Sequence, residues 1–220
     1  MSVMETRLSL NSLFMSGMVL QQNTTNCISG ICNPAERIEL KFRGKTYGTK
    51  SDKRGFWNIK LAPETAGGPY EMDIKCSTGE ELKLKDIYFG EVWLCSGQSN
   101  MQLPMERLAY SFPKDMTAPV NENIRVYTVP ITYSFDGEKK NCPPAVWNAV
   151  GPETLPAISG TSYFFAKKLY SDLKVPVGII NASQGGSPLA SWIDAKTARK
   201  WPDYAKRLDE CLDPAAVEEK

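Results

Sequence analysis

A chain of 220 residues, of which 42% are hydrophobic and 10% aromatic, can form one large or two small domains around a true core. Its 26 Lys and Arg residues nearly balance its 25 Asp and Glu residues, and this balance argues against nucleic acid or an acidic membrane surface as a partner. No apolar run reaches the ~18 residues that a membrane span needs.

The first twenty residues do not read as a signal peptide. Glu5 and Arg7 stand where such a peptide needs its apolar centre. We therefore expect a cytoplasmic protein, and a secreted or periplasmic one only if a leader precedes Met1. The six cysteines are scattered, and only Cys27 and Cys32 are close in sequence. Without a second pair or a histidine they make a weak zinc site, so we expect reduced structural thiols, no metal and no cofactor.

Residues 1–85 have the pattern of short β-strands with one solvent-exposed face. Ile38, Leu40 and Phe42 alternate with charged residues, and the stretches 57–61 and 70–74 repeat this alternation. Turn sequences rich in Gly, Pro and Asn separate them. Several short strands at this spacing predict a small antiparallel β-sandwich domain.

From residue 86 onward the pattern becomes that of an α/β domain. The expected elements are a strand at 87–95, a short helix near 101–110, a strand at 124–129, a helix ending near 173 and an apolar strand at 175–182. Ser159 or Thr161 can cap the longer helix. Beyond Ser187 a charged, helical tail follows, with Pro202 and Pro214 as breaks. Strand, helix and strand in succession predict a parallel sheet, and hence a second domain at 86–220.

This second domain looks incomplete. It offers two or three core strands, fewer than parallel α/β sheets usually contain, and a parallel strand without its neighbour leaves an apolar edge. The chain also contains no histidine. A missing C-terminal half would explain both observations.

Ser99 is the first candidate for chemistry. It lies between Gln98 and Asn100 in a tight polar turn that follows a buried strand, at what we expect to be the carboxyl edge of the sheet. A serine hydroxyl needs a nearby base to become nucleophilic, and histidine is the usual base. No lysine is tied to Ser99 by a motif that would make it a substitute.

The segment NASQGGS at 181–187 is the second candidate, because it ends the other apolar strand. If the two strands are parallel, it lies at the same edge as Ser99. Glycines there let a backbone N–H approach a ligand closely, as an oxyanion hole requires. The alternative is an ordinary glycine turn before Pro188.

The run DIYFGEVWLCSGQSNMQLPM at 86–105 resembles the nucleophile block of the sialate O-acetylesterases, members of the SGNH/GDSL hydrolase superfamily. Four further blocks resemble the same family in the same order. They are LFMSGMVLQQ, GFWNIKLAPETAGGPYEMDI, SGTSYFFAKKLY and VPVGIINASQGGSPLASWID.

This resemblance implies a small β-sandwich domain followed by an SGNH-type, flavodoxin-like α/β/α domain. It implies serine-dependent hydrolysis of acetyl esters on sugars, with an O-acetylated sugar as substrate. Ser99 would be the nucleophile and would donate an oxyanion N–H, while Gly186, or alternatively Gly185, would donate a second. The family's later Gln-Gly-Glu and Asp-x-x-His motifs have no counterpart here. A C-terminal half would have to supply them, and the chain alone would be inactive.

Three further residues have two interpretations each. Gln98 and Asn100 can contact the substrate or hold the turn through bonds to the backbone. Trp192 can stack on a sugar ring or belong to the core of the following helix. Two functions compete with the esterase: a non-catalytic carbohydrate-binding module, and an inactive fragment.

Overall fold

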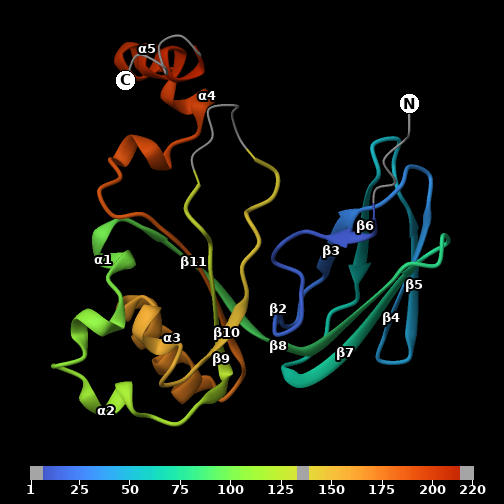
Figure 1. Ribbon diagram of the computed structural model, residues 1–220, viewed down its shortest axis with the longest axis horizontal. Helices are drawn as coiled ribbons and strands as arrows, with labels where there is room; N and C mark the ends of the chain where they lie inside the picture. Colours follow the sequence, from blue (N-terminus) through green and yellow to red (C-terminus); the bar gives the residue numbers. More distant parts are fainter. Residues whose placement is uncertain (1–6, 133–138, 214–220) are drawn as a thin grey trace.

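The computed structural model of this chain describes residues 7–132 and 139–213, and its strands form two sheets (Figure 1). The strands are β1 (Ser9–Leu10), β2 (Val19–Gln21), β3 (Asn26–Ile31), β4 (Arg37–Phe42), β5 (Lys45–Lys50), β6 (Phe56–Leu61), β7 (Gly67–Cys76), β8 (Glu81–Gly97), β9 (Asn121–Thr128), β10 (Trp147–Val150) and β11 (Val177–Ser183). The helices are α1 (Ser99–Gln102), α2 (Pro113–Met116), α3 (Gly160–Leu173), α4 (Ala195–Ala198) and α5 (Pro202–Leu212), with 3₁₀ turns η1 (Met105–Leu108), η2 (Leu155–Ala157) and η3 (Leu189–Trp192).

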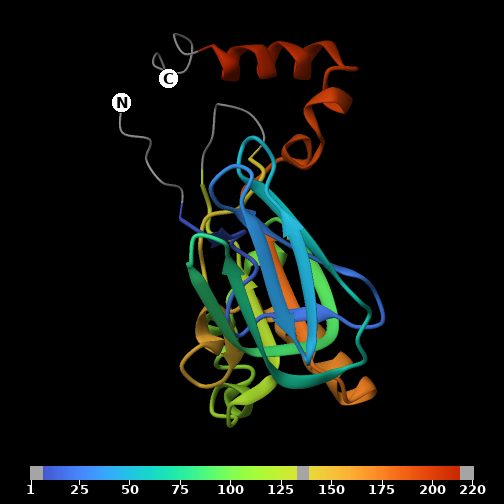
Figure 2. The same ribbon diagram turned by 90° about the vertical axis from the view of Figure 1, so that its right-hand side faces the viewer.

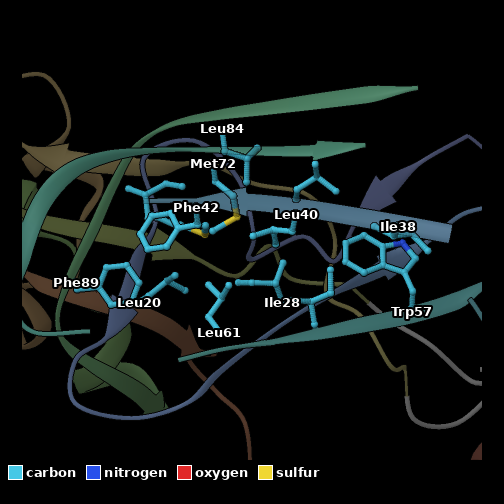
Figure 3. Packing of buried hydrophobic residues seen from close by; sticks show 14 of the residues in the cluster. Leu20, Ile28, Ile38, Leu40, Phe42, Trp57, Leu61, Met72, Leu84 and Phe89 are labelled. Atoms are coloured by element: carbon cyan, nitrogen blue, oxygen red, sulfur yellow. The ribbon is translucent and has the colours of Figure 1, made fainter. Parts of the chain in front are cut away.

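The N-terminal strands form the predicted sandwich, which is antiparallel except where β2 pairs parallel with β8. One sheet has the order β1-β3-β6, and it packs against β4, β7 and the first half of β8. Residues in β4 and β6 alternate strictly between exposed and buried, which explains why their alternation is visible in the sequence. Figure 3 shows the resulting core, in which Ile28 and Leu61 from one sheet face Leu40 and Met72 from the other.

The second sheet continues through both halves of the chain. Its order is β10-β9-β11-β8-β7-β4-β5, and β2 also pairs with β8. The 17-residue strand β8 pairs antiparallel with β7 in its first half and parallel with β11 in its second. The hydrophobic core of the sandwich also includes Tyr127 and Trp147 from the C-terminal half. A boundary after residue 85 falls inside β8, and the division into domains 1–85 and 86–220 stays a prediction.

Strands β8, β11 and β9 are mutually parallel in the order β9-β11-β8, as the α/β pattern predicted. Helix α3 covers one face of them, and Ser159 caps it by accepting the Ser162 N–H at 3.2 Å. On the other face Leu94 is 66% exposed. Among the described residues, 91–97 of β8 form a sheet ladder only with β11. The predicted fold class is therefore confirmed as a β-sandwich joined to a parallel α/β part.

The expected bounds of the short helix near 101–110 are wrong. Helix α1 ends at Gln102 and η1 starts at Met105, because Pro104 is extended and disfavours a helical conformation at the residue before it. In the tail, the predicted break at Pro202 is confirmed: α4 ends at Ala198, and Pro202 begins α5, as the first helical position allows. Pro214 lies outside the described residues.

Helix α5 lies beyond the ends of both sheets in the two views (Figure 1, Figure 2). An ion pair between Arg199 and Asp209, 2.8 Å long, ties it to the residues that follow α4. In the part of the chain that the structure describes, no helix has the length and apolar character that a bilayer span requires.

Candidate active site

Ser99 is the first residue of α1, directly beyond the end of β8. Gly97 has φ of 142°, a conformation that favours glycine, and this lets the chain leave the sheet abruptly. The Gln98 side-chain oxygen accepts two hydrogen bonds from Ser99, one from the backbone N–H at 3.2 Å and one from the hydroxyl at 2.9 Å. Gln98 therefore holds the turn, and its amide oxygen is too weak a base to activate the hydroxyl.

The glycine loop after β11 is bonded to the same turn. The Gln184 N–H donates to the Gly97 carbonyl at 2.9 Å, and the Gly185 N–H donates to Gln102 Oε1 at 2.6 Å. The N–H of Gly186, which has φ of 78°, has no hydrogen-bond acceptor among the described residues. Gly186 thus keeps a donor available for a ligand, whereas the donor of Gly185 is already used.

Both candidate segments line one cavity of about 630 Å³ at the carboxyl ends of β8, β9 and β11. Its lining residues are Ser99, Gln102, Leu103, Pro104, Glu106, Arg107, Thr128, Val129, Ile131, Ala157, Ser159, Asn181, Ser183, Gly185 and Gly186. The parallel register that joins Ser183 to Gly97 brings them together. Ligands of open α/β sheets bind at this edge.

The remaining predicted site residues lie outside this cavity. The backbone carbonyl of Asn100 accepts a hydrogen bond from the Thr161 hydroxyl at 2.9 Å, so this residue ties α1 to α3. Trp192 lines a neighbouring cavity. Sequence reasoning missed Gln102, although it lies three residues after Ser99 on the same helical turn, where side chains share a face.

A buried amide supports the floor of the cavity. Asn181 is 4% exposed, and its oxygen accepts from the Ser183 N–H at 3.1 Å and from the Ser183 hydroxyl at 2.5 Å. Its nitrogen donates to the Ser162 hydroxyl of α3 at 3.4 Å. These bonds fix the end of β11, from which the glycine loop departs.

An ion pair holds α2 against α3, the helix that covers one face of the parallel strands. Asp115 accepts hydrogen bonds from the Tyr163 hydroxyl at 2.6 Å and from the Lys167 ammonium group. Burial alone would raise the pKa of Asp115, but these two donors lower it below its ordinary value. Burial and the Asp115 carboxylate together raise the pKa of Tyr163. In the described ranges, no group of three or more Cys, Asp or Glu side chains could hold a metal ion.

Ser99 and Gly186 thus line one cavity at the carboxyl edge of a parallel sheet, in a fold of the SGNH type. No family model matches the chain. Sialate O-acetylesterase from Rattus norvegicus is 28% identical over 145 residues, which are 62% of this chain and 27% of that protein. The Homo sapiens sialate O-acetylesterase is 28% identical over 152 residues, or 65% of this chain and 29% of that protein.

A solved structure is also similar. The crystal structure of a carbohydrate acetylesterase from Xanthomonas citri superposes with a TM-score of 0.83 and 32% identity, covering 88% of this chain and 44% of that one. These similarities support the assignment of the chain to the family of the sialate O-acetylesterases. It spans less than a third of the curated relatives named above and less than half of the solved structure.

Proposed function

We propose that this chain carries the nucleophile and oxyanion donors of a carbohydrate O-acetylesterase. The observation that carries the proposal is that Ser99 and Gly186 line a single cavity at the sheet edge. The acetylesterase names of its relatives support the same reaction. The substrate would be an acetyl ester on a sugar, with acetylated sialic acid as the first candidate.

The reaction would pass through an acetyl-serine intermediate. The Ser99 oxygen would attack the acetyl carbonyl carbon, and the hydroxyl proton would pass to a base. The N–H groups of Ser99 and Gly186 would stabilise the negative oxygen of the tetrahedral intermediate. The ester bond to the sugar would then break, the sugar oxygen would take up the proton, and water would release acetate from Ser99.

The backbone N–H of Ser99 becomes available only if the Gln98 side chain moves. In the resting structure this N–H donates to Gln98 Oε1. A carbonyl oxygen arriving in the cavity would replace that amide oxygen as the acceptor. Gln98 therefore serves as a resting-state partner of the nucleophile in this proposal.

The base would come from a C-terminal half that lies outside these 220 residues. The chain contains no histidine, and Ser99 donates its hydroxyl hydrogen bond to an amide oxygen. Leu94 is largely exposed, and 91–97 of β8 have one open edge among the described residues, as expected for a surface that another strand and helix would cover. We propose that a C-terminal half docks there and supplies the Gln-Gly-Glu and Asp-x-x-His motifs.

Acetate release from O-acetylated sialic acid tests the proposal. We expect the native gene product, with its intact mass measured, to hydrolyse the ester, and the 220-residue chain alone to be about 10⁴-fold slower or inactive. Ser99→Ala should abolish the native activity, while Ser191→Ala, an exposed serine of η3, should leave it unchanged. Full activity of native Ser99→Ala would refute the assigned nucleophile. Robust, Ser99-dependent hydrolysis by the chain alone would refute the need for another base.

A non-catalytic carbohydrate-binding module is the second candidate. The hydrogen bond from the Ser99 hydroxyl to Gln98 favours it, because this amide oxygen is the only hydrogen-bond partner of the hydroxyl among the described residues. In this case the native product would bind acetylated sugars equally well after Ser99→Ala, and it would release no acetate.

A further inference from the structure

A second, larger cavity of about 1010 Å³ adjoins the one that contains Ser99. Val129, Ile131 and Ser183 line both cavities, so the two lie side by side at the edge of the sheet. The larger cavity extends from this shared wall toward the sandwich, where Phe14 and Ser29 line it. A ligand longer than one sugar unit and held at Ser99 would therefore reach the larger cavity.

The lining of the larger cavity combines aromatic faces with amides and hydroxyls. Trp192 is 42% exposed, and its indole N–H donates to the Ser187 hydroxyl at 3.0 Å, which fixes the ring at the cavity. Asn11, Gln184 and Phe14 also line it. Sugar rings present apolar C–H faces and many hydroxyls, so an oriented indole next to amides suits them.

The distant segments that form this cavity are bonded to one another without any ligand. The Ser12 hydroxyl donates to the Cys142 carbonyl at 2.7 Å, and the Ser12 N–H donates to Asn141 Oδ1 at 3.0 Å. The Trp147 indole N–H donates to the Leu13 carbonyl at 3.0 Å. Because these bonds fix the walls in advance, binding would not have to order them.

We propose that the larger cavity is an accessory subsite, which binds the sugar unit next to the acetylated one through Trp192. The preferred ligand is then an O-acetylated oligosaccharide and not a free monosaccharide. This inference rests on the proposed function, because it takes the acetylated unit to sit at Ser99.

Binding by the 220-residue chain tests this inference through NMR titration. The probes are sialyllactose and free sialic acid, each with a hydrolysis-resistant acetamide in place of the acetyl ester. We expect the trisaccharide to bind about tenfold more tightly. Trp192→Ala should remove about three- to tenfold of this advantage without changing the affinity for free sialic acid, and Trp192→Phe should restore part of it. The matched control is Trp201→Ala, since Trp201 is 48% exposed and lines neither cavity.

Two results separate this inference from the proposed function. If free sialic acid binds at Ser99 but the trisaccharide binds no more tightly, the accessory subsite is wrong and the proposed function stands. The subsite is equally wrong if Trp192→Ala and Trp201→Ala cause the same loss. If neither probe shifts the resonances around Ser99 and neither binds the native gene product, both the proposed function and the subsite are wrong.

Discussion

Replacing Gly90 by alanine would separate the two strands that bring Ser99 and the glycine loop together. Gly90 lies in β8 where the chain that enters β11 passes closest. A Cβ atom added there would lie 1.9 Å from the Pro176 carbonyl oxygen and 2.6 Å from its carbon. Both neighbours are backbone atoms, so no side-chain rotation can relieve the overlap.

The cost follows from two effects. The backbone must move by about 1 Å in a packed interior, and overpacking of this kind costs ~1–3 kcal/mol. The same movement stretches the 2.9 Å hydrogen bond from the Glu91 N–H to the Pro176 carbonyl, which contributes ~1 kcal/mol. We therefore expect Gly90→Ala to lower the free energy of unfolding by about 3 kcal/mol, or Tm by about 10 °C.

Gly48→Ala provides the matched control. Gly48 is also a strand glycine, and its added Cβ would meet no heavy atom closer than 4.0 Å. Alanine is favoured over glycine in a strand by ~0.5–1 kcal/mol, so this variant should be slightly more stable than the parent. Thermal and urea unfolding followed by circular dichroism measure both. Equal stability of the two variants would refute the close contact between β8 and Pro176.

Two further variants test the surroundings of the site. Gln102→Leu should speed amide hydrogen exchange at Gly185 by about fivefold, because the N–H loses its 2.6 Å acceptor, whereas Gln102→Glu should preserve slow exchange; equal exchange in both would contradict this anchor. Asp115→Asn should lower the free energy of unfolding by about 1 kcal/mol at pH 7, because Tyr163 and Lys167 hold a carboxylate there. Since the pKa of Asp115 is lower in the folded chain, its stabilisation is present above the ordinary pKa of an aspartate and is lost as the pH falls through the folded value. Urea unfolding at pH 7 and pH 3 should therefore show a smaller difference between parent and variant at pH 3, and a constant difference would refute the shift.

Local pattern was sufficient for most of the individual elements. The alternation around Leu40 and Ile59 predicted β4 and β6, because each strand buries one face and the period of two is visible within six residues. The apolar run that became β11 and the serine cap of α3 were equally local. The position of Ser99 after a strand, and its proximity to the glycine loop, followed from the expectation that both strands are parallel. The expectation that the strand before Ser99 is buried was wrong for Leu94, which is 66% exposed because no described element covers that face.

Only the tertiary structure determined which strands pair with one another across the two halves of the chain. Strand β8 is shared by both halves of the chain because its first part pairs with β7 and its second part pairs with β11. Pairing between segments that are distant in sequence produces no hydrophobic periodicity in either segment, so the sequence could not predict it. The same holds for Gln102, whose acceptor meets the Gly185 N–H 83 residues away, and for the choice between Gly185 and Gly186 as the free donor. Residue types and spacing therefore predicted the candidate nucleophile, whereas its hydrogen-bond partners depend on contacts that only the folded chain creates.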